Sequence, residues 1–141
     1  MAFKFEGLDV WQLALAYVDL SYQIAEQLPR SEEHHLKSQL LRAATSVALN
    51  IAEGSTGQTD AEQGRFLGMA IRSLPETVAC QQIIRRRQLL QDFARLDQAY
   101  HEAEMLAKKL TALRKAVAPQ QTWVREEPTG YLVDAAQEPT S

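Results

Sequence analysis

The residues with the greatest capacity for metal chemistry are two acids and two histidines in consecutive positions, 32–35. Neighbouring residues on a helix point about 100° apart, so four consecutive side chains cannot converge on one ion. Glu32 and His35 have the spacing of a metal-binding pair, but a dinuclear carboxylate bundle needs that pair twice. The remaining histidine, His101, is preceded by Gln98 where such a pair would need a glutamate. The sequence therefore predicts a solvated helix start, with no metal and no cofactor.

No arrangement for nucleophilic or acid–base catalysis stands out. The single cysteine, Cys80, falls on an apolar helical face, which predicts a buried and unreactive thiol. The segment 54–57 has the composition of a phosphate-binding loop, but it lacks a preceding strand and the Gly-Lys-Ser/Thr ending. One cysteine also excludes an internal disulfide. We expect a protein that is not an enzyme.

Three consecutive arginines, Arg85, Arg86 and Arg87, form the sharpest charged feature. In an antiparallel bundle they would share one end with Arg30 and Lys37. The opposite end would gather a second group of cations, namely Lys108, Lys109, Arg114 and Lys115. Both groups could contact the phosphates of DNA or RNA, or they could match the negative ends of helix dipoles in solvent. The sequence leaves both interpretations open.

Length and charge narrow the class of protein. The chain has 141 residues, of which 45% are hydrophobic and 23% charged, as in one ordinary globular domain. Residues 1–117 carry 14 basic and 14 acidic residues, whereas the last 24 carry one arginine and four acids. The body is therefore neutral, and nucleic acid could be attracted only by local patches. No apolar run approaches the roughly 20 residues of a membrane helix, so we expect a cytoplasmic protein.

Apolar residues recur at helical spacing in four segments separated by short polar stretches. These segments cover residues 8–28, 32–53, 60–88 and 93–117. Four amphipathic helices with short connections predict an all-α fold, an up-down-up-down antiparallel four-helix bundle over residues 1–117. Residues 118–141 lose the periodicity, which predicts a flexible or loosely docked tail.

Local signals indicate where these helices begin and end. Ser31, followed by two glutamates, is the candidate N-cap of the second helix, and Gly54 is placed to end that helix in a left-handed cap. Thr59 opens a capping-box pattern with Glu62 at the start of the third helix. Pro75 lies inside the third helix and predicts a kink without a break.

The first helix carries more apolar surface than one bundle face needs. One stripe runs from Val10 to Leu28, and a second stripe runs beside it from Trp11 to Ala25. Such a helix has one face for its own bundle and another for a second chain. The pattern therefore predicts a homo-oligomer, with Trp11 and Leu13 on the surface between chains.

Glu53 lies at the C-terminal end of the second helix, where the helix dipole disfavours a negative charge. We expect a specific partner to compensate, and the candidates are Arg42, Arg65 and Arg72. Asn50, one turn earlier, would join the same group. This arrangement predicts a structural hydrogen-bonded network and a loss of stability when Glu53 is replaced by glutamine.

Three motifs resemble a family of small bacterial four-helix-bundle proteins named for the intervening sequence of 23S ribosomal RNA. They read Phe5-x-x-Leu8-x-Val10-Trp11-x-x-Ala14, Leu36-x-x-Gln39-Leu40-x-Arg42-Ala43-Ala44-x-Ser46-Val47-x-x-Asn50-Ile51-Ala52-Glu53-Gly54 and Phe66-Leu67-x-x-Ala70-x-x-Ser73-Leu74-x-Glu76. The resemblance covers residues 5 to about 113. Within the motifs we expect structural roles for Arg42, Ser46, Asn50, Glu53, Gly54 and Glu76.

The resemblance implies a homo-oligomer in the form of a five-membered ring. A related fold, the accessory variability protein of diversity-generating retroelements, binds nucleic acid and a reverse transcriptase. The leading hypothesis is therefore a non-enzymatic oligomeric scaffold or adaptor that binds DNA, RNA or a nucleic-acid enzyme through its basic ends. The alternative is an oligomeric module that binds only protein partners. Neither hypothesis involves a membrane.

Overall fold

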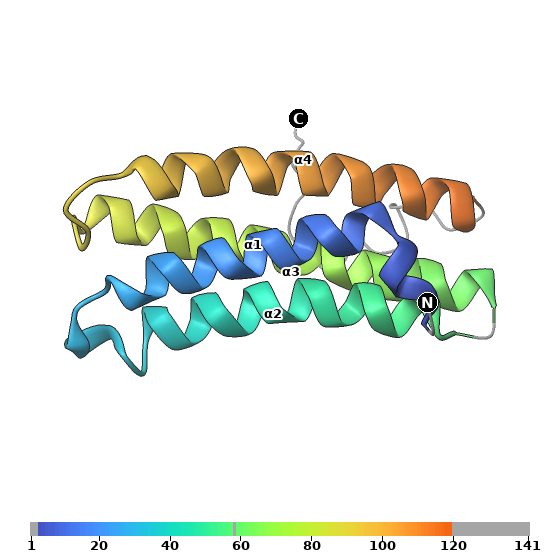
Figure 1. Cartoon of the computed structure of the whole chain (residues 1–141), viewed down its shortest axis with the longest axis horizontal. Helices are drawn as coiled ribbons and strands as arrows, with labels where there is room; N and C mark the ends of the chain where they lie inside the picture. The colour runs from blue at the N-terminus through green and yellow to red at the C-terminus, as the bar shows by residue number, and fades with distance from the viewer. Residues whose placement is uncertain (1–2, 58, 120–141) are drawn as a thin grey trace, which may run out of the picture.

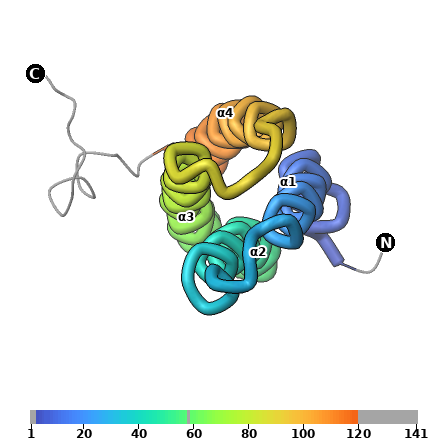
Figure 2. Tube along the Cα trace, turned by 90° about the vertical axis from the view of Figure 1, so that its left-hand side faces the viewer, coloured from blue at the N-terminus to red at the C-terminus, as the bar shows by residue number. Residues whose placement is uncertain are grey.

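A computed structural model describes residues 3–57 and 59–119 of the chain. Its helices are α1 (Asp9–Glu26), α2 (Leu36–Ser55), α3 (Asp60–Arg86) and α4 (Ala94–Val117), with short 3₁₀ turns at Lys4–Gly7 and Arg30–Glu32. The four helices run alternately up and down one long axis (Figure 1). Each packs against the next, and α1 closes the bundle against α4 (Figure 2). The predicted all-α antiparallel four-helix bundle is confirmed. The predicted tail lies outside the described residues from position 120 onward.

The core is built from one apolar stripe on each helix, as the periodicity predicts. On α4 the buried apolar residues recur at intervals of three and four, namely Leu96, Ala99, Ala103, Leu106 and Leu110. Cys80 of α3 is buried in the same core. Burial raises the pKa of its thiol, and the nearby Glu76 carboxylate raises it further. The thiol is therefore held protonated, which agrees with the predicted unreactive cysteine.

The beginning of α2 differs from the prediction, whereas that of α3 agrees with it. After Pro29 the chain forms a 3₁₀ turn, and His35, with φ −120° and ψ −103°, lies outside the helical region. The helix therefore begins at Leu36, and the prediction that Ser31 caps it is wrong. At α3, the Thr59 hydroxyl oxygen accepts a hydrogen bond from the Glu62 backbone N–H at 3.0 Å. That N-cap is confirmed.

Gly54 does not end α2 in a left-handed cap, so this prediction is also wrong. It lies inside the helix and is buried, and no described glycine has a positive φ. A Cβ atom at position 54 would lie 2.9 Å from the Phe66 Cβ and 3.3 Å from the Gln63 carbonyl oxygen. Glycine is therefore needed here because the start of α3 packs directly against this turn of α2. Further along, α3 continues through Pro75 without a break, which confirms that part of the prediction.

A polar layer crosses the centre of the bundle. Tyr17 of α1 is completely buried, and its hydroxyl lies 2.6 Å from the Thr77 hydroxyl of α3. Gln81 donates from Nε2 to the Tyr17 oxygen at 2.9 Å, and Thr77 donates to the Leu74 carbonyl at 2.6 Å. Tyr17 must then donate to Thr77, which gives every hydrogen in this chain of bonds an acceptor. Because α1 and α3 lie diagonally opposite (Figure 2), the layer fixes their register.

Two polar atoms near this layer are not satisfied. The Ser21 hydroxyl and the Gln81 Oε1 atom are buried, and neither has a hydrogen-bond partner within the described part of the chain. Ser21 follows Tyr17 by one helical turn on α1, and Gln81 follows Thr77 by one turn on α3. The core therefore contains a hydrogen-bonded polar layer that stabilises the fold. Beside it, the Ser21 hydroxyl and the Gln81 Oε1 atom cost stability because they are buried without a partner in the described chain.

Replacement of Tyr17 by phenylalanine should lower the free energy of unfolding by about 1–3 kcal/mol, because the buried amide of Gln81 would lose its acceptor. Replacement of Ser21 by alanine should leave the free energy unchanged or raise it by up to about 1 kcal/mol, because it removes an unsatisfied hydroxyl. Urea titrations followed by circular dichroism measure both values. A Ser21→Ala variant less stable than Tyr17→Phe would contradict this assignment.

Candidate nucleic-acid interface

The arginines at the end of α3 are not equivalent. Arg85 forms an ion pair with Asp97 of α4, and its guanidinium carbon lies 4.7 Å from the centre of the Phe93 ring. It therefore clamps the end of α3 to the beginning of α4. Arg86 and Arg87 are exposed, and neither forms an ion pair with an acid in the residues described. These two cations are the ones available to a ligand.

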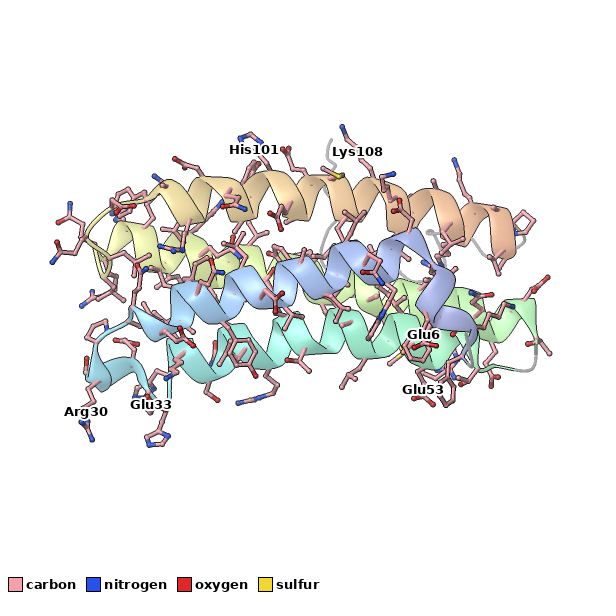
Figure 3. The ribbon with its side chains drawn as sticks, viewed as in Figure 1. Glu6, Arg30, Glu33, Glu53, His101 and Lys108 are labelled. Carbon is pink, nitrogen blue, oxygen red and sulfur yellow. The ribbon has the colours of Figure 1, made fainter. Side chains whose placement is uncertain are left out.

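Arg30 and Lys37 lie toward the same end of the bundle, as the antiparallel topology predicts (Figures 1 and 3). Arg30 is exposed on the 3₁₀ turn before α2. The Lys37 ammonium lies 3.2 Å from a Glu33 carboxylate oxygen, so its charge is partly compensated. The end of α3 and the turn before α2 thus place Arg30 and two arginines of α3 at one end, and none of the three forms an ion pair with a described acid.

The second predicted cation group is dispersed. The Lys109 ammonium pairs with Asp9 of α1 at 3.1 Å, and Lys108 lies on the outer side of α4, away from its end (Figure 3). Arg114 is only 4% exposed, which removes it from any surface for nucleic acid. Its guanidinium packs against Gly68, where a Cβ atom would come within 2.8 Å of the Arg114 guanidinium carbon. Among these four residues, the end of α4 exposes only Lys115.

A groove that the sequence did not indicate lies between α3 and α4 beside the arginine cluster. The residues that line it are Val78, Gln81, Gln82, Arg85, Arg86, Leu96, Asp97, Tyr100 and His101. Tyr100, on α4, is 45% exposed. The sequence feature that could have indicated this groove is the position of Tyr100, one turn after Asp97 and four residues after the buried Leu96.

Part of the long motif on α2 serves helix packing. The Ser46 hydroxyl lies 3.0 Å from the Ser73 hydroxyl of α3. The Asn50 amide donates to the Ser46 carbonyl at 2.9 Å and to its hydroxyl at 3.1 Å, and Ser73 donates to the Met69 carbonyl at 3.1 Å. These small polar side chains form a seam that lets α2 and α3 approach closely.

The acidic members of the motifs lie at the surface. Glu53 is exposed, and in the described chain its carboxylate has no hydrogen bond or ion pair. Arg42 instead donates to the Ser38 hydroxyl at 2.8 Å, and Arg65 stacks over the Phe66 ring at 4.7 Å. The predicted network around Glu53 is therefore wrong. Glu76 is exposed as well.

The apolar side chains that α1 exposes most are not the two predicted to lie between chains. Trp11 and Leu13 are half-buried against the core of their own chain, and Trp11 meets the Phe5 ring edge-on at 4.7 Å. Leu15 and Tyr22, two turns apart on the same helix, are 38% and 46% exposed. The neighbouring helix α2 exposes 60% of Leu49. Exposed apolar side chains therefore occur on both α1 and α2.

Within residues 3–57 and 59–119, no three His, Cys, Asp or Glu side chains are grouped in a way that could hold a metal ion. None of the described helices combines the length and the apolar character needed to cross a membrane.

The chain matches one protein-family model and is similar in fold to a solved structure. The family model for the 23S rRNA-intervening sequence protein matches residues 6–112. The chain belongs to this family. Its fold is similar to the crystal structure of a protein of unknown function from the S23 ribosomal protein family of Bacteroides thetaiotaomicron, with a TM-score of 0.69 and 20% identity. That match covers 75% of this chain and 98% of the other. Functionally curated proteins give no match.

Replacement of Glu53 by glutamine should change the free energy of unfolding by less than about 0.5 kcal/mol, because the carboxylate is exposed and unpaired within the described chain. The dipole at the end of α2 even favours removing the charge. Replacement of Ser46 by valine is the matched comparison on the same helix, since it breaks the contact with Ser73, and it should be clearly destabilising. Thermal denaturation of both variants checks the contrast. A large loss of stability in Glu53→Gln would instead support the predicted hydrogen-bonded network around Glu53.

Proposed function

We propose that this protein is a homo-oligomeric scaffold, not an enzyme, that binds nucleic acid through the cations at the α3 end of the bundle. The observation that carries the proposal is the exposure of Arg30, Arg86 and Arg87 at one end, without ion pairs to described acids. Because the body of the protein is neutral and the unpaired cations lie at one end, each chain would contact only a few phosphates of a nucleic acid. Its place of action would be the cytoplasm.

Self-association would multiply this weak charge. Exposed apolar side chains on α1 and α2, above all Leu15, Tyr22 and Leu49, offer a surface for a second copy. A ring of five, as the family resemblance implies, would carry five copies of each exposed arginine. Several weak phosphate contacts on one assembly bind a long polyanion far more tightly than one contact does.

The second candidate function is an oligomeric module that binds only protein partners. It is favoured by the Arg85–Asp97, Lys37–Glu33 and Lys109–Asp9 pairs, which neutralise much of the basic charge within the chain. In this case the remaining cations would only match the helix dipoles at the bundle end. Nucleic-acid binding, measured directly, separates the two candidates.

Light scattering of the purified protein should return an integral multiple of the 15.9 kDa chain mass, with five as the expected multiple. Replacement of Leu49 by glutamate should reduce this mass, because a charge would be buried between chains. Trp11 and Leu13 are unsuitable for this test, since they pack against their own core.

The matched control is Ile83→Glu, because Ile83 is 46% exposed and belongs to α3, not to the two helices that carry Leu15, Tyr22 and Leu49. It should leave the mass unchanged. A wild-type mass of one chain at micromolar concentration would eliminate the oligomer.

Binding of a labelled RNA oligonucleotide should weaken steeply as salt rises from about 50 mM to 200 mM, because phosphate contacts release counterions. An Arg86→Ala/Arg87→Ala double variant should lose most of the binding and keep its oligomeric mass. Arg85 is left intact because it clamps α3 to α4. Arg65→Ala/Arg72→Ala, with two exposed arginines toward the other end of α3, is the control. No binding at about 50 mM salt would favour the protein-binding module.

A further inference from the structure

The groove between α3 and α4 has an arrangement that phosphate contacts alone do not require. It opens beside Arg86, in the last turn of α3, and its other wall comes from the first two turns of α4. Val78 and Leu96 supply apolar lining between the two walls. An exposed aromatic ring, Tyr100, stands on the α4 wall.

Tyr100 is available for stacking. Its side chain is 45% exposed, and its hydroxyl makes no hydrogen bond to the part of the chain that the structure describes. The one described aromatic neighbour is the ring of His101, 6.2 Å away and nearly perpendicular at 77°, so it does not cover the tyrosine face.

The charges around the ring are arranged at the edges of the groove. Arg85 lines the groove but is paired with Asp97 and stacked over Phe93, so its charge is compensated within the chain. Arg86 stands exposed on the α3 edge. His101 is exposed on the α4 edge, with Nδ1 3.8 Å from a Glu104 oxygen. The result is an aromatic platform with a free cation at one side.

We propose that this groove binds single-stranded nucleic acid, with one base stacked on Tyr100 and an adjacent phosphate on Arg86. The inference rests on the proposed function and adds to it a strand preference and a binding mode. Every base has a π-face, so stacking of this kind tolerates any sequence. A duplex keeps its bases paired inside, and it can therefore use the arginines but not the tyrosine.

The experiment measures the affinity of the full-length protein for a labelled single-stranded oligonucleotide and for the corresponding duplex, at the same salt concentration. Tyr100→Ala should weaken single-strand binding about tenfold, the loss typical of one stacked base, and leave duplex binding unchanged. Tyr100→Phe keeps the ring and should retain the affinity. Met105→Ala is the matched control, because Met105 is 46% exposed on the same helix and does not line the groove.

The outcomes distinguish this inference from the proposed function. If single strands and duplex bind with equal affinity and Tyr100→Ala changes neither, the stacking site is refuted and phosphate binding by the arginines remains. Equal losses in Tyr100→Phe and Tyr100→Ala would also refute stacking, since the ring would then not be the group that binds. If neither nucleic acid binds at about 50 mM salt, both proposals fail. Circular dichroism and light scattering show that each variant keeps its fold and mass.

Discussion

A tyrosine hydroxyl buried in the middle of a helical bundle needs hydrogen-bond partners, and for Tyr17 these are provided by α3, the diagonally opposite helix. The Tyr17 hydroxyl accepts from Gln81 and donates to Thr77, and any other register of α1 against α3 would leave it unsatisfied. Burial raises the pKa of this hydroxyl, so it stays protonated and able to donate. The position of α3 along the bundle, and hence of its terminal arginines, depends on this layer.

The approach of α2 to α3 is the second constraint, and it accounts for much of the family's longest motif. Gly54 admits the start of α3, and Ser46, Asn50 and Ser73 form a polar seam between the two helices. These positions need small or hydrogen-bonding side chains because the two helices pack closely there. Glu53, in the same motif, has no such role within one chain, because its carboxylate is at the surface.

The bundle divides its basic residues between structure and surface. Arg85, Lys37 and Lys109 each pair with an acid of the same chain, and Arg114 is buried beside Gly68. A count of the basic residues in the sequence would treat these four as equivalent charges. Among the cations that stay exposed without an ion pair, Arg30, Arg86 and Arg87 lie together at the α3 end, next to a groove that carries an aromatic ring. The proposals above depend on this group because exposed, unpaired cations keep their full attraction for phosphate.

The sequence by itself determined the four helices, their antiparallel order, the Thr59 cap and the buried state of Cys80, because each follows from local periodicity or short-range hydrogen bonding. It also located the arginine cluster at one end. It failed at Ser31, where a 3₁₀ turn follows Pro29, at Gly54, which packs against the start of α3, and at Glu53, whose carboxylate meets no described partner. Only the tertiary structure decided that Arg85 and Lys109 are paired, that Arg114 is buried and that Tyr100 faces a groove. Those properties depend on contacts between residues far apart in sequence. A local sequence pattern does not show which side chains come into contact when the helices pack.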